Sequence, residues 1–150
     1  MEIWWVGADS SVQAAFWYEG SQWQRYELAP GGSASPTGGI AAVARIPNSM
    51  EVWWVGENRS VQAAYWYEGS HWQRYELAPA GSSASSGGIS AVARIPNSME
   101  VWWVGANGSV QDAFWYDQML GEVQIDVRTE RHQFGGWINA SGEGFTPNNR

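Results

Sequence analysis

The sequence contains no cysteine and no lysine, and it has no long apolar run. Without cysteine, neither disulfide bonds nor cysteine-ligated metal sites can hold the fold together. No stretch reaches the roughly 20 apolar residues of a membrane-spanning helix. The start, Met1-Glu2-Ile3-Trp4, lacks the basic residues and apolar stretch of a signal peptide. Membrane insertion is therefore not expected, and the sequence leaves the protein's location open, secretion included.

Positive charge is also scarce. The eight cationic residues are all arginine and are scattered along the chain, whereas there are 15 acidic residues, which gives a formal net charge of −7. Binding to a phosphate backbone needs a concentrated positive surface, and the sequence has no basic run that would supply one. Nucleic acid is therefore not expected as a partner.

The chain is instead rich in repetition. Residues 4–52 and 53–101 are identical at 38 of their 49 positions. A third copy begins at Trp102 and keeps step as far as Tyr116, and after a divergent stretch Gly135-Gly136 restores the register. We therefore expect one repeat domain over residues 1–150, with a divergent third repeat at 102–150. Such repeats build solenoids or radial arrays, and they predict several similar sites.

Each unit has the pattern of four short strands. One set of four is expected at residues 40–45, 50–55, 61–67 and 72–77, which spans the boundary of the first two units; the strands are separated by Gly, Pro and Asn turns and followed by a longer connection. The strand at 50–55 is apolar on both faces, as expected for a sheet between two others. Four antiparallel strands in about 49 residues are typical of a β-propeller blade. The fold class expected is all-β, with about three blades packed face to face.

Three blades are fewer than the four to eight of a closed propeller. Residues 137–140 are expected to supply the strand missing before Met1, and so to close the first blade. The chain is then part of a larger ring, completed by a second copy or by a longer array; the restored register favours a homo-oligomer. Met1 aligns with internal repeat positions, which leaves open a start further upstream. Residues 118–133 are expected to hold an altered fourth strand.

The blade pattern carries a family resemblance. It runs Gly-Gly-Ile, a small-residue strand, Pro-Asn, an apolar strand ending in Gly, an aromatic pair, Glu-Gly-Ser and Trp. This pattern resembles the repeat of bacterial β-propeller lectins related to the fucose-binding propeller of insect-pathogenic bacteria, and more loosely the tectonin and fungal fucose lectins. It covers nearly the whole chain outside residues 118–133. The resemblance implies several sugar sites between adjacent blades, glycans as partners and no catalysis.

Aromatic side chains offer a flat face to the C–H groups of a sugar ring, while guanidinium and carboxylate groups bind its hydroxyls. The candidate ligand-binding residues at the outer part of each blade are Trp17, Tyr18, Trp23, Arg25, Trp66, Tyr67, Trp72, Arg74, Trp115 and Tyr116. The third unit lacks the Trp and Arg of the last strand, so one site is expected to be degraded. No metal or cofactor is expected, because His71 and His132 are isolated.

Several of the repeated residues have a structural interpretation. Core packing is expected for six tryptophans: Trp4, Trp5, Trp53, Trp54, Trp102 and Trp103. Arg45 and Arg94 are as suited to holding a loop carbonyl as to binding ligand. The Asp or Asn at positions 9, 58 and 107 are expected to be turn residues.

Two other functions stay open. One is a propeller platform for protein–protein interaction without a sugar site. The other, a glycoside hydrolase, is less favoured, because catalysis needs an asymmetric pair of carboxylates and nearly every acidic residue here has a twin in the next unit. A non-enzymatic lectin is preferred because linked weak sites raise avidity by about 10² to 10⁴.

Overall fold

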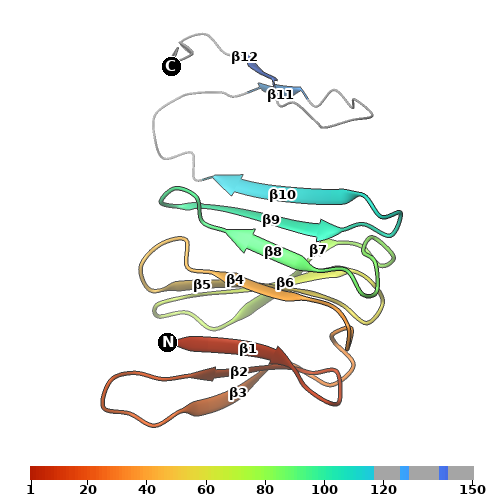
Figure 1. Cartoon of the computed structure of the whole chain (residues 1–150). Helices are drawn as coiled ribbons and strands as arrows, with labels where there is room; N and C mark the ends of the chain where they lie inside the picture. The colour runs from red at the N-terminus through yellow and green to blue at the C-terminus, as the bar shows by residue number, and fades with distance from the viewer. Residues whose placement is uncertain (117–125, 129–138, 142–150) are drawn as a thin grey trace. The chain divides into compact units, whose positions relative to one another are not determined.

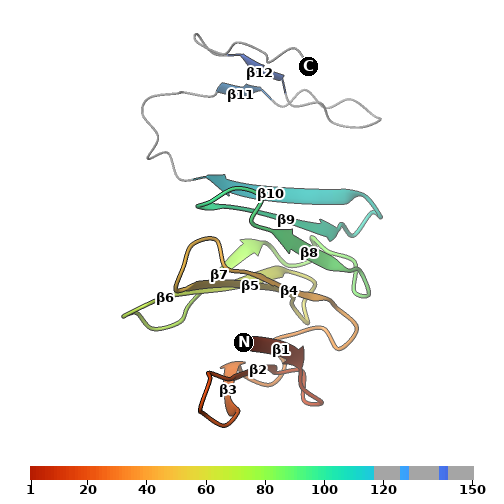
Figure 2. The same ribbon diagram turned by 60° about the vertical axis from the view of Figure 1, so that its left-hand side comes forward.

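The computed structural model describes residues 1–116, 126–128 and 139–141. The chain divides into two compact units, Met1–Tyr116 and Asp117–Arg150. In the first unit three antiparallel sheets are stacked face to face (Figure 1), and the turned view in Figure 2 shows the same stacking. The described residues are all β, as expected, and within them no helix has the length and apolar character needed to cross a membrane.

The three sheets correspond to the three repeats. Blade 1 consists of β1 (Glu2–Val6), β2 (Val12–Phe16) and β3 (Gln24–Ala29). Blade 2 consists of β4 (Ile40–Val43), β5 (Ser49–Val55), β6 (Val61–Tyr67) and β7 (Gln73–Ala78). Blade 3 consists of β8 (Ile89–Val92), β9 (Ser98–Val104) and β10 (Val110–Tyr116). In the second unit β11 (Asp126–Arg128) pairs with β12 (Asn139–Ser141).

Blade 2 confirms the four-stranded antiparallel pattern, with its strands in chain order. Blades 1 and 3 each show three strands among the described residues. The strand predicted at 137–140 overlaps β12, and its closure of blade 1 stays a prediction. Most of the predicted altered strand within 118–133 lies outside the described residues.

Strand β5 is buried on both faces, as its sequence predicts. Val52 and Trp54 pack with residues of blade 1, including Val12. Trp53 faces the other way and packs with residues of blade 3, including Val101. Burying one such side chain contributes roughly 1.5–3 kcal/mol, so these two interfaces supply much of the driving force for stacking the blades.

The first strands of blades 2 and 3, β4 and β8, lie side by side and contact each other. Ala41 and Ala42 give β4 small side chains at this contact. Just before it, a Cβ atom on Gly39 would meet the backbone nitrogen of Ile89 at 2.7 Å. Only glycine allows the two blades to approach so closely at this point.

The turns after β1, β5 and β9 share one construction. The Oδ1 of Asn58 accepts hydrogen bonds from the backbone nitrogen of Ser60 (3.1 Å) and from its hydroxyl (2.6 Å), and Asp9 and Asn107 make the same bonds. The expectation that these are turn residues is confirmed. The next residue has positive φ in each copy, 63° at Ser10, 62° at Arg59 and 78° at Gly108.

The prediction of core packing holds for three of the six tryptophans and is wrong for Trp5. Trp53 and Trp54 are each 2% exposed, and Trp103 is also buried. Trp5 is the counterpart of Trp54 in blade 1, but it remains 36% exposed. Trp5 is exposed because it lies on the face of blade 1 that is turned away from blade 2.

Candidate functional site

An aromatic pocket of about 390 Å³ lies between blades 2 and 3. Its aromatic lining consists of Trp53, Tyr65, Tyr67, Tyr75, Phe114 and Trp115, and the remaining lining residues are Glu51, Leu77, Met99, Val101 and Ala113. This volume lies within the range of roughly 300–1,000 Å³ found for ligand pockets, which are mostly apolar with a few polar groups.

The strand register creates the hollow. Trp53 of β5 pairs with Ala63 of β6, and Ala63 pairs with Tyr75 of β7, so the three side chains form one row on the face toward blade 3. Side chains in paired positions share a face, and a methyl group between two large rings leaves space. Trp115 of β10 bounds this space from the opposite blade.

A charged cluster, the Arg45 triad of Arg45, Glu51 and Tyr67, lies beside the pocket. The Nε of Arg45 lies 3.1 Å from the Oε1 of Glu51. Its Nη2 donates to the Tyr67 hydroxyl at 2.6 Å, and that hydroxyl donates to Glu51 at 2.9 Å. Arg45 also reaches blade 3, where its Nη1 donates to the Oδ1 of Asn97 and its guanidinium lies over the ring of Trp115.

Burial dominates the electrostatics of this cluster. It raises the pKa of Glu51, although hydrogen bonds from Tyr67 and Arg45 act in the opposite direction. Burial also raises the pKa of Tyr67 above its usual value. The Tyr67 hydroxyl is therefore neutral over the physiological range and can both donate and accept a hydrogen bond.

The three repeats present this cluster in three states. In blade 3 the side chain of Arg94 pairs with Glu100 at 3.3 Å but is 59% exposed, compared with 10% for Arg45. In blade 1 the corresponding carboxylate, Glu2, instead accepts a hydrogen bond from Tyr26 at 2.5 Å. Blade 3 repeats the triad as Arg94, Glu100 and Tyr116. Among the described residues, only the guanidinium of the Arg45 triad also contacts the next blade.

Four of the predicted site residues of blades 2 and 3 are divided between the aromatic pocket and the opposite face of blade 2. Tyr67 and Trp115, predicted in separate repeats, line the same aromatic pocket. Trp72 packs instead on the other face of blade 2, where its ring lies 6.3 Å from that of Tyr26. Arg74 also faces away from the aromatic pocket and lines a second, polar pocket.

The other predicted residues line neither pocket. Tyr18, Trp23 and Arg25 are exposed on blade 1, and Trp17 and Trp66 are half-buried. The hydroxyl of Tyr116 accepts a hydrogen bond from Arg94 and donates one to Glu100.

The sequence analysis did not identify Glu51 as a site residue, and so it did not predict the contact between Arg45 and Glu51. Arg45 contacts a side-chain carboxylate and two aromatic rings of neighbouring strands, rather than holding a loop carbonyl with its side chain. A signal was present, because Glu51 interrupts the apolar run of a strand buried on both faces. A carboxylate in such a place needs a cationic or hydrogen-bonding partner.

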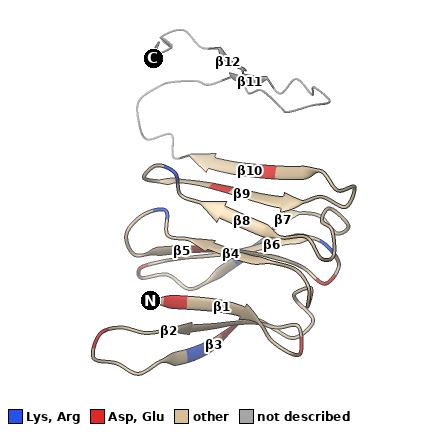
Figure 3. Cartoon of the chain, viewed as in Figure 1, with Lys and Arg blue, Asp and Glu red and all other residues tan. Residues whose placement is uncertain are grey.

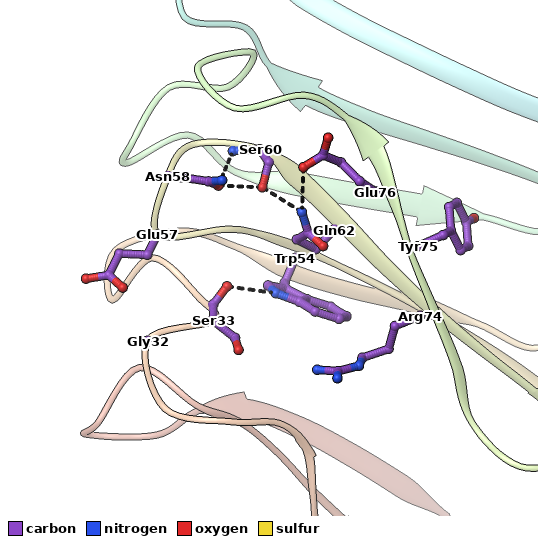
Figure 4. Close-up of a pocket in the computed structure, with 10 residues that line it drawn as sticks. All are labelled: Gly32, Ser33, Trp54, Glu57, Asn58, Ser60, Gln62, Arg74, Tyr75 and Glu76. Atoms are coloured by element: carbon purple, nitrogen blue, oxygen red, sulfur yellow. Dashed lines mark hydrogen bonds between the residues drawn. The ribbon is translucent and has the colours of Figure 1, made fainter.

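The polar pocket has a volume of about 640 Å³ (Figure 4). It is lined by Gly32, Ser33, Trp54, Glu57, Asn58, Ser60, Gln62, Arg74, Tyr75 and Glu76. Across the described residues, no group of three or more His, Asp or Glu side chains could hold a metal ion. Figure 3 shows the arginines of the first unit at single positions along strands and loops.

Stacked antiparallel sheets of one repeat, joined in chain order, are blades of a β-propeller. No family model matches the chain, and no curated protein matches it either. Among solved structures, the BP39L lectin from Burkholderia pseudomallei is similar at a TM-score of 0.69 and 20% identity, over 78% of this chain and 34% of the lectin. SapL1, a lectin solved in complex with alpha methyl fucoside, is similar at 0.61 and 17% identity, over 94% of this chain and 42% of SapL1.

A third similar structure is AofleA from Arthrobotrys oligospora, at a TM-score of 0.59 and 14% identity, over 94% of this chain and 39% of AofleA. At these identities the likeness defines the fold. The chain spans about a third to two-fifths of the length of these structures. Its described sheets are thus blades of a larger propeller, as the repeat count predicts.

Proposed function

We propose that this protein is a non-enzymatic lectin whose aromatic pocket binds a saccharide between adjacent blades. The observation that supports the proposal is the pairing of Tyr67 and Trp115 from two blades across one pocket that also contains a buried carboxylate, Glu51. The propeller lectins with the same fold give the class of ligand.

The pocket has the two kinds of contact that a sugar ring needs. Trp115 is 39% exposed, so part of its ring is free to pack against the C–H face of a pyranose. The hydroxyl of Tyr67 keeps a lone pair for a ligand hydroxyl and is held in place by its hydrogen bond to the buried carboxylate of Glu51. A fucoside is the first ligand to test, because SapL1 was solved with alpha methyl fucoside.

We also propose that identical copies complete the ring. On the outer face of blade 1, Ile3 and Trp5 are exposed, whereas their counterparts Val52 and Trp54 are buried against a neighbouring blade. That face is therefore shaped to receive a further blade. A ring of such copies repeats the sugar site and gives the avidity that weak single sites require.

The experiment is a titration with methyl α-L-fucopyranoside after a glycan-array screen. We expect a dissociation constant in the millimolar range for one site. Trp115→Ala weakens binding about tenfold or more, while Ile95→Ala, at an exposed position outside the pocket, leaves it unchanged. Trp66→Ala and Trp72→Ala test in the same way the two predicted ligand-binding tryptophans of blade 2 that lie outside the aromatic pocket.

A folded protein that binds no glycan on the array would overturn the lectin and favour the protein-interaction platform. Ring completion is tested separately by sedimentation equilibrium. A mass of two or more times the 16.6 kDa of one chain supports it. A monomer at every concentration tested overturns it.

A further inference from the structure

We propose that the copies that complete the ring are joined at one specific seam. At this seam the outer face of blade 3 in one copy packs on the outer face of blade 1 in the next, and Asp112 pairs with Arg25 of that second copy. The inference rests on the proposed completion of the ring by identical copies. It adds which faces meet, and in which direction the chains follow one another.

The two interfaces within the chain show what each face of a blade contacts. Trp53 and Ala63 pack with residues of blade 3, whereas Val52 and Ala64, one position away on the same strands, pack with residues of blade 1. The face toward the next blade and the face toward the preceding blade therefore carry different residues. A blade added at either end of the stack continues it head to tail.

The outer face of blade 1 is the kind of face that packs on a preceding blade. Ile3, Ala15 and Arg25 are paired across β1, β2 and β3. Their counterparts in blade 2 form the row that begins with Val52, and this row is packed against blade 1. The outer face of blade 1 is therefore suited to a blade that presents the other kind of face.

The outer face of blade 3 is of that other kind. Val110, Asp112 and Phe114 alternate along β10 and point away from blade 2, and all three are exposed. The counterpart of Val110 in blade 2, Val61, is fully buried in the cluster between blades 2 and 3. Figure 3 shows one acidic segment on β10, in the middle of this face.

Asp112 sets the outer face of blade 3 apart from the other blades. Residues 110–116 differ from residues 12–18 at this position alone, where the first repeat has Ala14. Ala14 and its counterpart Ala63 are 0% and 1% exposed, and both lie on faces covered by the next blade. A blade seated on blade 3 in the same way buries the carboxylate, which is costly unless it has a partner of opposite charge. The seam therefore requires a cation on the receiving face.

Arg25 is the cation that the receiving face provides. Within the chain, the ring of Trp72 in blade 2 lies 6.3 Å from that of Tyr26 in blade 1, and Tyr26 is the register partner of Ala14. Arg74 follows Trp72 by two positions, and in Figure 4 its guanidinium extends toward the connection from blade 1. Arg25 occupies the place of Arg74 in the repeat. In a second copy it reaches the same region of the blade that it meets, and at the seam that region holds the carboxylate of blade 3.

Neighbouring charged side chains on the two faces have partners in their own blades. Glu100 is paired with Arg94 at 3.3 Å, and Glu27 accepts a hydrogen bond from a glutamine of β2 at 3.2 Å. Among the described residues, Asp112 and Arg25 make no hydrogen bond or ion pair. Opposite charges on two complementary faces select the partner face and its register.

The number of blades fits a ring of two copies. The seam joins two unlike faces, and interfaces of this kind form a closed ring when the rotation between copies closes. Two chains of three blades give about six blades, which lies within the four to eight of closed propellers. Such a ring has two identical seams.

The test is charge reversal followed by sedimentation equilibrium. Arg25→Asp places two carboxylates at each seam, and Asp112→Arg places two guanidinium groups there. We expect each variant to self-associate at least about tenfold more weakly than the wild type, because like charges that meet at an interface are strongly unfavourable. Arg59→Asp makes the same charge change as Arg25→Asp at an exposed turn of blade 2, and we expect it to leave association unchanged.

An equal mixture of the two reversed variants gives the sharpest result. In a ring with one chain of each kind, one seam keeps the original pair and the other has the pair with its charges exchanged. We therefore expect the mixture to recover the association of the wild type, and native mass spectrometry to show one chain of each kind in a ring. Recovery also shows that both variants are folded.

The outcomes that overturn the seam are distinct from failure of the ring or of the lectin. If the wild type forms rings and the single variants associate as tightly, the copies meet at other faces and ring completion stands. If the mixture stays dissociated, Asp112 and Arg25 do not pair. A wild type that is monomeric at every concentration overturns both the ring and the seam. The aromatic pocket lies within one chain, so glycan binding tests the lectin proposal independently of these results.

Discussion

The guanidinium carbon of Arg45 lies 4.4 Å from the centroid of the Trp115 ring, although the two residues belong to different blades. The same guanidinium is paired with Glu51, which is 1% exposed. Arg45 thus neutralises a buried carboxylate in its own blade and contacts an aromatic ring in the next. It connects the stability of blade 2 to the position of a wall of the aromatic pocket.

Replacement of Arg45 by Ala is expected to destabilise the protein by about 3 kcal/mol, because it leaves a buried carboxylate without its cation. Urea unfolding measures the effect. Arg94→Ala is the matched control, since Arg94 makes the same pair with Glu100 at an exposed position, and we expect its midpoint to stay close to that of the wild type. Adding Glu51→Gln to Arg45→Ala is expected to restore part of the loss. Equal destabilisation by Arg45→Ala and Arg94→Ala would argue against a special stabilising role for the buried Arg45–Glu51 pair.

The Gly-Gly pairs before β4 and β8 give a second matched comparison. A Cβ on Gly39 would lie 2.7 Å from the backbone nitrogen of Ile89, whereas nothing lies within 4 Å of a Cβ on Gly88. Gly39→Ala is therefore expected to cost about 1–3 kcal/mol by forcing two blades apart. Gly88→Ala is expected to be neutral. Thermal unfolding distinguishes them, and a neutral Gly39→Ala would mean that the blades are not packed as closely as described.

The fold was largely predictable from the sequence because its signals repeat. The apolar faces of 50–55 and the turn residues after them recur in register, and they predict the strands of blade 2 and the burial of Trp53 and Trp54. The exposure of Trp5 was not predictable from the repeat. Identical sequence in two copies does not show which copy has a neighbour on a given face.

The candidate site was predictable in composition but not in arrangement. The sequence predicts that Tyr67 and Trp115 are site residues, but it does not indicate that they line the same pocket. They meet because β6 and β10 face one another across the interface, and that contact depends on the stacking of sheets rather than on residue spacing. The sequence analysis placed Arg74 and Tyr67 in one set of candidates because they lie close together in the repeat. Strand alternation places their side chains on opposite faces of blade 2.

The turn between β5 and β6 offers a stabilising substitution. Arg59 has a φ of 62°, a region that is costly for residues with a side chain, whereas the third repeat has Gly108 at this position. Arg59→Gly is expected to raise stability by up to about 1 kcal/mol, because the left-handed strain is worth about 1–2 kcal/mol and glycine's greater freedom in the unfolded chain offsets part of it. Gly108→Ala is expected to change stability in the opposite direction. Denaturant midpoints check both, and a destabilised Arg59→Gly would show that the Arg59 side chain makes a contact that matters.

Tyr26 predicts how stability depends on alkaline pH. Burial and the hydrogen bond that Tyr26 donates to Glu2 raise its pKa above the usual value of 10.0. Above about pH 10 the unfolded chain therefore loses this proton while the folded protein keeps it, so the free energy of unfolding falls as pH rises. For one tyrosine the slope approaches about 1.4 kcal/mol per pH unit.

Tyr26→Phe is expected to be less stable than the wild type at neutral pH, because the variant loses the bond to Glu2, but its stability falls less steeply between about pH 9 and 11. Burial also raises the pKa of Tyr67 and Tyr75, so the variant retains part of the slope. Tyr18→Phe removes a hydroxyl from an exposed ring and is the control for the loss of a tyrosine hydroxyl as such. Urea unfolding across this range gives the comparison. Parallel curves for Tyr26→Phe and the wild type would mean that the Tyr26 hydroxyl ionises as readily in the folded protein as in the unfolded chain.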